Sequence, residues 1–201
     1  MNLAAVASLP QQPLTGTWFR AIQPHHWATA LFASSVPSRF NPGSQPAGPP
    51  FELLYLAENP QVALFEVEAL LGSPTRPGGL IANPASAETM LNVAVILQNV
   101  VDLTRLDAQN RLATSVQELT GDWRGYETRS PSTSVTEPFG VAAPTQELGA
   151  ALFGLADLEG FLAVSARLPY SKNLVVFPQK LRPGSSLAFT YPATGERYAL
   201  P

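Results

Sequence analysis

Two arginines of this chain lie next to aromatic residues, a setting that suits the binding of an anionic ligand. Arg20 ends the segment Trp18-Phe19-Arg20, and Arg39 begins the segment Arg39-Phe40-Asn41. The planar guanidinium group donates two parallel hydrogen bonds, which makes arginine a good partner for phosphate groups. Taken singly, however, each arginine is more typical of a surface ion pair than of a binding site.

Glu66 breaks the pattern of the segment that contains it. Residues 60–71 are predicted to form a helix, on which Glu66 falls in line with the apolar Val62 and Phe65. A carboxylate on a core-facing stripe is costly unless it is paired or functional. The structural alternative is a glutamate at the helix edge, neutralised by an arginine. If the segment were a strand instead, Glu66 and Glu68 would share a face and form a paired-carboxylate site of the glycosidase type.

Other residues with chemical potential are less informative by themselves. Tyr55 lies on the apolar face of a predicted strand, where a tyrosine is usually core and its hydroxyl finds one partner. Ser165 ends another predicted strand. His25 and His26 are adjacent and have no companion, so they do not match the spacing of a metal site on a helix and are interpreted as surface or packing residues. No metal site is expected.

The elements that position these residues indicate an α+β fold. Hydrophobic periodicity and turn residues predict strands and helices that alternate without a strict strand–helix–strand rhythm. Residues 1–13 are expected to be a flexible segment and 14–201 a single domain. The predicted strands cover 14–22, 51–57, 91–101, 160–166 and 173–177, with a last strand pair after 183; the predicted helices cover 60–71, 108–119 and 146–155, with a short helix or turn at 24–35 and loops at 37–50, 73–89 and 126–145.

Composition excludes several classes of protein. The net charge is −3 and no basic run is present, so direct nucleic-acid binding is not expected. The chain has no cysteine, which excludes disulfides, thiolate zinc sites and cysteine nucleophiles. No apolar run reaches the roughly 18 residues that a membrane span needs, and the start does not resemble a signal peptide, so a cytoplasmic location is expected.

Taken in order, these residues resemble the signature of the RES-domain family, which is named after its Arg, Glu and Ser. Arg20 matches the arginine of the first strand, and Ser38-Arg39-Phe40-Asn41-Pro42-Gly43 resembles a Gly-Gly-Arg-Trp-Asn-like turn. Further islands of similarity are Tyr55-Leu56-Ala57, Ala63-Leu64-Phe65-Glu66, Gln146-Glu147-Leu148-Gly149, Val164-Ser165-Ala166 and Asn173 to Pro178. The family's paired glycines are Pro37-Ser38 here, and its Trp is Phe40.

The resemblance implies a compact ADP-ribosyltransferase-like domain, with a small, mainly antiparallel sheet and flanking helices. It implies an enzyme that cleaves NAD+ as its substrate, by hydrolysis or phosphorolysis, and that needs no cofactor. Glu66 would stabilise the charge that develops on the ribose. Arg20 and Arg39 would bind the pyrophosphate, Tyr55 would stack on nicotinamide or ribose, and Ser165 would hydrogen-bond the substrate. Catalysis would thus involve Glu66, Arg39 and Ser165.

The resemblance also implies a biological setting and leaves alternatives open. Many members are toxins of toxin–antitoxin pairs held inactive by an Xre-type antitoxin, and a homodimer is compatible with the sequence. One alternative is an ADP-ribosyltransferase that acts on a protein target. Another is a non-catalytic interaction module, which predicts that Arg39 and Glu66 do not meet in one pocket.

Overall fold

A computed structural model describes residues 1–43, 50–72, 79–86, 88–127, 142–192 and 194–201 of the chain. Its strands are β1 (Gln11–Ile22), β2 (Leu54–Ala57), β3 (Leu70–Gly72), β4 (Leu80–Ala82), β5 (Thr89–Asp102), β6 (Gly160–Val164), β7 (Lys172–Val176), β8 (Ser186–Thr190) and β9 (Arg197–Leu200). Its α-helices are α1 (Pro60–Glu66), α2 (Leu106–Arg111), α3 (Val116–Thr120), α4 (Arg124–Glu127) and α5 (Pro144–Phe153). Short 3₁₀ helices span Leu3–Ser8, Pro24–Thr29 and Pro178–Lys180.

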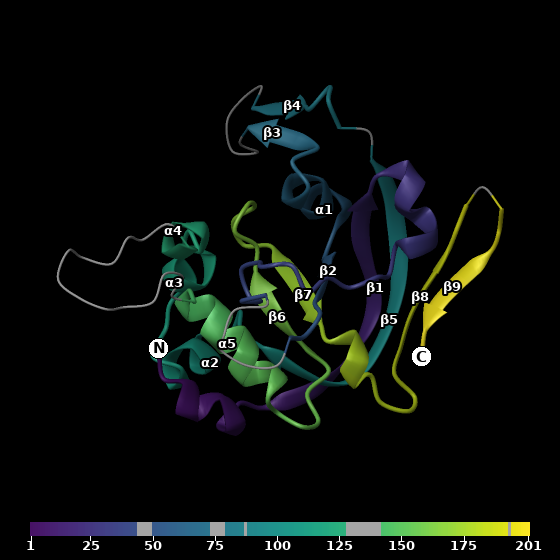
Figure 1. The fold of residues 1–201 in the computed structure, drawn as a ribbon. Coiled ribbons are helices and arrows are strands. Elements are labelled where there is room, and N and C mark those ends of the chain that lie inside the picture. The colour runs from purple at the N-terminus through teal and green to yellow at the C-terminus, as the bar shows by residue number, and fades with distance from the viewer. Residues whose placement is uncertain (44–49, 73–78, 87, 128–141, 193) are drawn as a thin grey trace.

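The main sheet has seven strands in the order β1-β2-β7-β6-β5-β8-β9, and β1 also pairs with β5. The strands β1, β2, β7, β6 and β5 therefore form a closed ring of pairings. The β5–β6 pair is parallel, and the other described pairs are antiparallel. Helices α2, α3 and α5 gather on one side of the molecule, opposite the β8–β9 hairpin (Figure 1). The expected α+β class with a mainly antiparallel sheet is confirmed.

The long strand β5 is central to the core because alternate side chains along it are buried. Leu91, Val93, Val95 and Leu97 are each at most 1% exposed, whereas the residues between them face solvent. This period of two places one face of the strand against the hydrophobic interior. A second hydrophobic cluster packs α2, α3 and α5 against β6 and β7.

The N-terminal residues are ordered against this core, contrary to the expected flexible segment over 1–13. Leu3–Ser8 forms a 3₁₀ helix, and β1 already begins at Gln11. Val6 is 2% exposed and Leu9 is 4% exposed. Two apolar side chains with this much buried surface bind the segment to the domain, which periodicity could not indicate in so short a stretch.

Two predicted helices are shorter than expected. The helix predicted over 60–71 ends at Glu66, because residues 70–72 pair as a strand with residues 80–82, inside the loop predicted at 73–89. The helix predicted over 108–119 is two helices, α2 and α3, separated where Ala113 adopts a positive φ of 48°. Much of the loop predicted at 126–145 lies outside the described residues, while Arg124–Glu127 forms α4 and Pro144–Phe153 forms α5.

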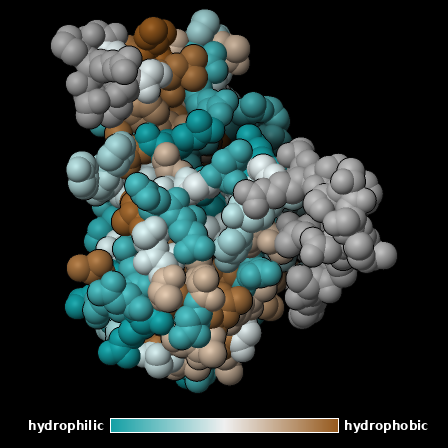
Figure 2. All heavy atoms as spheres, turned by 90° about the vertical axis from the view of Figure 1, so that its left-hand side faces the viewer, coloured by the Kyte–Doolittle hydropathy of each residue, from teal (hydrophilic) through white to brown (hydrophobic). Residues whose placement is uncertain are grey.

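The β3–β4 hairpin carries much of the exposed apolar surface on the face shown in Figure 2, where brown atoms gather at the top. Leu71, Leu80 and Ile81 are exposed there, the last by 61%. Within the described parts of the chain, no helix is both long and apolar enough to cross a membrane.

Glu159 is a buried carboxylate with a structural role, since it is 0% exposed and joins three segments. Its oxygens accept hydrogen bonds from the backbone N–H groups of Gln98 (2.6 Å), Asn99 (2.9 Å) and Arg182 (2.8 Å). Burial by itself would raise the pKa of Glu159, but the Ser185 side chain and these backbone N–H groups together outweigh it and hold the pKa below its usual value.

We expect Glu159→Gln to lower the free energy of unfolding by about 1–3 kcal/mol at pH 7, because an amide cannot accept all three bonds. A lowered carboxyl pKa contributes stability that is present above the unfolded pKa of about 4.3 and is lost as the pH falls through the folded value. Urea unfolding at pH 7 and at pH 4 measures both effects. Equal free energies of unfolding for Glu159→Gln and the wild type at pH 7 would contradict this structural role of Glu159.

Candidate functional site

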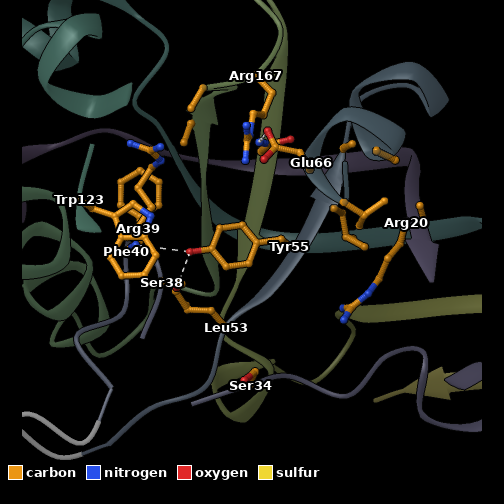
Figure 3. A pocket seen from close by; sticks show the side chains of 18 of the residues that line it. Arg20, Ser34, Ser38, Arg39, Phe40, Leu53, Tyr55, Glu66, Trp123 and Arg167 are labelled. Atoms are coloured by element: carbon orange, nitrogen blue, oxygen red, sulfur yellow. Dashed lines mark hydrogen bonds between the residues drawn. The ribbon is translucent and has the colours of Figure 1, made fainter. Parts of the chain in front are cut away.

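A cavity of about 780 Å³ opens where β1, β2, β6, β7 and α1 meet. This volume lies in the range of small-molecule sites. Figure 3 shows Arg20 of β1, Tyr55 of β2 and Glu66 of α1 among the side chains that line it. The described lining is Phe19, Arg20, Ala21, Ile22, Ser34, Val36, Pro37, Ser38, Arg39, Phe40, Leu53, Tyr55, Leu56, Ala57, Ala63, Glu66, Val67, Thr120, Asp122, Trp123, Arg124, Ala163, Val164, Ala166, Arg167 and Asn173.

Glu66 is the last residue of α1, and its side chain is presented to the cavity. The helix begins with Asn59, whose side chain accepts a hydrogen bond from Val62 N (3.0 Å), followed by Pro60 at the first helical position. Val62 and Phe65 are buried, but Glu66 is exposed. The predicted place of Glu66 on the buried stripe is therefore wrong. The seven-residue helix ends at this position, so its carboxylate faces the open cavity.

Two side chains hold one oxygen of the Glu66 carboxylate. Ser165 Oγ donates to Oε1 at 2.8 Å, and Asn173 Nδ2 donates to the same oxygen at 2.7 Å. These donors come from the end of β6 and the start of β7, which are adjacent in the sheet. Among the described residues, no donor reaches Oε2. The carboxylate is therefore fixed in direction while one oxygen is left for a ligand.

The Ser165 side chain contacts Glu66 and does not itself line the cavity. It is 3% exposed, and its hydroxyl, which donates to Glu66, also accepts from the backbone N–H groups of Arg167 (3.2 Å) and Leu168 (3.1 Å). A hydroxyl has one proton and two lone pairs, so these three bonds use its full capacity. The expectation that Ser165 hydrogen-bonds the substrate does not fit this geometry. It is a positioning residue.

We expect Ser165→Ala and Asn173→Ala each to lower kcat by about tenfold or more, because a loosened carboxylate loses its reactive placement. Only Ser165→Ala should also cost about 1–3 kcal/mol of stability, since it leaves two backbone N–H groups without an acceptor. The two variants thus separate positioning from folding. Turnover in the reaction that the family resemblance implies, release of nicotinamide from NAD+, and thermal unfolding are measured in parallel. Wild-type kcat in both variants would show that neither donor positions Glu66.

Arg39 is placed by a turn that packs against α5. The backbones of Ser38 and Asn41 are hydrogen-bonded to each other, and Gln146 Nε2 donates to both of their carbonyl oxygens (3.0 and 3.2 Å). Asn41 is 0% exposed and donates to Phe51 O at 2.8 Å. Gly149 lets the helix approach so closely that a Cβ there would stand 1.8 Å from Phe40 O.

The Arg39 guanidinium reaches from this turn across the cavity wall. Its Nη1 donates to the carbonyl oxygens of Leu119 (3.4 Å), which lies in α3, and of Gly121, just beyond α3. Burial lowers the pKa of Arg39, and the negative charge of Glu66 opposes that shift. Arg39 and Glu66 therefore meet in one cavity, contrary to what the non-catalytic alternative predicted.

Tyr55 forms part of the wall between these two charges. Its hydroxyl is hydrogen-bonded to Ser38 Oγ (2.9 Å) and accepts from Phe40 N (3.4 Å), which fixes the ring (Figure 3). Burial raises the pKa of Tyr55 to about 12. The phenol therefore stays protonated at neutral pH, and the residue offers its ring rather than a base. Phe40, in place of the tryptophan of the motif, is 2% exposed and packs edge-on against Phe161.

Arg20 lies in another part of the cavity and has unused hydrogen-bonding capacity. Its Nη2 donates weakly to Phe32 O at 3.4 Å, whereas its Nη1 is buried without a partner among the described residues. Burial lowers the pKa of Arg20 to about 10, so the guanidinium remains charged at pH 7. A buried cation with an unpaired donor favours an anionic ligand.

Several lining residues were not assigned a role from the sequence. Asn173 belongs to a motif of the sequence, whereas no sequence signal points to Arg167, Asp122 or Trp123. Glu68 adopts a positive φ of 59°, is not part of the cavity lining and forms an ion pair with Arg167. The paired-carboxylate alternative thus lacks its second carboxylate.

The charges of the lining suit a phosphate-bearing ligand. Four arginines face two carboxylates, so positive charge predominates. The arginines are Arg20, Arg39, Arg124 and Arg167, and the carboxylates are Glu66 and Asp122. The predicted residues Arg20, Arg39, Tyr55 and Glu66 line this one cavity, and Ser165 contacts it through Glu66.

The chain is similar to known proteins in sequence and in fold. The family model of the RES domain matches residues 17–194. A chain of the crystal structure of the M. tuberculosis MbcT–MbcA toxin–antitoxin complex shares the fold, with a TM-score of 0.62 and 21% identity over 98% of this chain and 91% of that chain. A comparison with curated protein sequences found no match. The extent of the family match, over residues that include the whole cavity lining, shows that this chain belongs to the RES domain family.

Proposed function

We propose that this protein cleaves the bond between nicotinamide and ribose in NAD+. The observation that carries the proposal is the Glu66 carboxylate, held through one oxygen by Ser165 and Asn173. It stands in a cavity that also contains Arg20 and Arg39. A fixed negative charge and two cations in one cavity match a substrate that develops positive charge at a ribose and carries two phosphates.

The chemistry follows from where charge appears during the reaction. As the C–N bond breaks, nicotinamide leaves with the bonding electron pair and positive charge builds on the ribose. A carboxylate oxygen fixed beside that ribose stabilises the transition state more than the ground state. Oε2 of Glu66 is the oxygen in a position to do this, since Oε1 is engaged. Arg39 holds the pyrophosphate so that the ribose stays in reactive geometry, and Arg20, in another part of the cavity, adds to its positive charge.

The acceptor decides between hydrolysis and phosphorolysis. With water, NAD+ gives ADP-ribose, nicotinamide and a proton. With inorganic phosphate, NAD+ gives ADP-ribose phosphate and nicotinamide. Transfer of ADP-ribose to a protein nucleophile uses the same bond cleavage at Glu66 and remains the alternative activity.

Mass spectrometry of purified protein incubated with NAD+ distinguishes these reactions. The incubation is done with and without phosphate, and Glu66→Gln serves as the inactive control. Free nicotinamide with ADP-ribose indicates hydrolysis, and phosphate-dependent ADP-ribose phosphate indicates phosphorolysis. If NAD+ is consumed only when a cell extract is added, and a protein gains the mass of ADP-ribose, transfer is the activity. Intact NAD+ under all these conditions contradicts the proposal.

We also propose that the protein is the toxin of a toxin–antitoxin pair with an Xre-type antitoxin. The support is its family and the fold that it shares with a chain of a toxin–antitoxin complex. Induced expression in a bacterial host should lower cellular NAD+ and stop growth, whereas the Glu66→Gln variant should not. Co-expression of an Xre-type protein encoded beside it should restore growth. Unchanged growth at a confirmed level of folded protein would contradict the toxin role.

A further inference from the structure

The turn that follows α3 forms one end of the cavity wall and is fixed from two sides. Arg39 Nη1 donates to the carbonyl oxygens of Leu119 and Gly121. Within the turn, Asp122 Oδ1 accepts from Arg124 N at 3.1 Å. These bonds fix the backbone on either side of Trp123, so the indole is presented to the cavity from a defined position (Figure 3).

Trp123 is not part of the core packing. It is half-buried, it lines the cavity, and it belongs to none of the three hydrophobic clusters of the described residues. The guanidinium carbon of Arg124 lies 5.4 Å from the centre of its ring, over one face. A large aromatic ring in a cavity wall, with a cation on one face, offers its other face to a flat π-system.

The groups along this wall follow a fixed order. In Figure 3, Glu66 lies on one side of the Tyr55 ring, and Arg39 and Trp123 lie on the other. Arg39 is also bonded to the carbonyl of Gly121, two residues before Trp123. A ligand that extends from Glu66 past Arg39 therefore arrives at Trp123, and it meets a carboxylate, a cation and an aromatic ring in that order.

We propose that Trp123 stacks on the adenine ring of the substrate and sets the preference for a dinucleotide over a mononucleotide. The inference rests on the proposed cleavage of NAD+. In that molecule the reacting ribose, the pyrophosphate and the adenine follow one another in the same order as Glu66, Arg39 and Trp123. Nicotinamide does not fit the same place, because it is bonded directly to the ribose that Glu66 must contact.

The test compares NAD+ with nicotinamide mononucleotide, which carries the same scissile bond but no adenosine half. Stacking of a base on an aromatic side chain corresponds to roughly a 5- to 150-fold effect on binding. We expect Trp123→Ala to lower the ratio of kcat/KM for NAD+ to kcat/KM for the mononucleotide by this factor, mainly through KM. Trp123→Phe should recover most of the ratio. An unchanged ratio in Trp123→Ala would overturn the inference.

Two further measurements keep the inference separate from the proposed function. Trp27→Phe is the matched control for loss of an indole, because Trp27 stacks on Tyr191 away from the described cavity lining and should keep the wild-type ratio. Binding of AMP, measured by calorimetry, needs no turnover. If the wild type binds AMP and Trp123→Ala does not, the stacking site is supported even where NAD+ is not cleaved. If the wild type cleaves NAD+ but AMP binds equally to both proteins, the stacking inference fails and the proposed function stands.

Discussion

Replacing Glu66 with Gln is expected to lower kcat for nicotinamide release by a factor of at least about 10²–10³, with a smaller change in KM. The amide has the size of the carboxylate and can still accept hydrogen bonds from Ser165 and Asn173 at one oxygen. It loses the negative charge that opposes the developing positive charge on the ribose, and a single stabilising group of this kind is worth about that factor. The folded structure should be unchanged.

Steady-state kinetics and a thermal unfolding curve together measure this effect. Glu147→Gln is a suitable control, because Glu147 is exposed on α5 and is not part of the described cavity lining. It removes the same charge and should keep kcat within a factor of about two, as expected for a distant surface residue. Turnover of Glu66→Gln close to that of the wild type would exclude the proposed mechanism.

Gly149→Ala is expected to have the second largest effect, on stability and activity together. The added methyl group would stand 1.8 Å from Phe40 O and 2.7 Å from Phe40 C, so either α5 or the turn that carries Arg39 must move. Overpacking of this kind costs about 1–3 kcal/mol, more than the roughly 1 kcal/mol that alanine gains over glycine within a helix. A shift of about 1 Å in a substrate-positioning group lowers turnover by about 10²-fold.

Gly154→Ala makes the same chemical change at the C-terminal end of α5. Gly154 has helical dihedral angles (φ −64°, ψ −18°), and the nearest atom to an added Cβ is Ala151 O at 3.3 Å. This control should unfold within about 1 kcal/mol of the wild type and keep its kinetics. Urea unfolding and NAD+ turnover of both variants give the comparison. If Gly149→Ala matched Gly154→Ala, the close contact would not position Arg39.

The sequence predicted the members of the site better than their roles. Arg20, Arg39, Tyr55 and Glu66 could be found because short motifs place them in a recognisable order. The role of Ser165 could not, since its three hydrogen-bond partners depend on how the loop after β6 folds back. Trp123 lies outside any periodic segment, and its place at the cavity depends on contacts of the folded chain such as the bonds of Arg39 to Leu119 O and Gly121 O.

The wrong predictions for helix lengths and for the N-terminal segment have a similar physical cause. The apolar positions of residues 60–71 continue a helical pattern. Residues 70–72 instead pair with residues 80–82, and the helix therefore ends at Glu66. The burial of Val6 and Leu9 likewise depends on surfaces formed much later in the chain. Local periodicity detects β5 because residues 91–98 alternate between buried and exposed positions, and it cannot detect pairings that only the complete fold supplies.

The closed ring of strands has a consequence for the timing of activity in the cell. Arg20 lies on β1, Glu66 follows β2, and Asn173 lies on β7, so the site draws on residues from most of the chain. Synthesis at about 5–20 residues per second takes roughly 8–30 seconds to pass from the first of these to the last. While β7 is still inside the ribosome, Asn173 cannot donate its hydrogen bond to the Glu66 carboxylate. For a protein proposed to destroy NAD+, this order of assembly delays catalysis until translation is nearly complete.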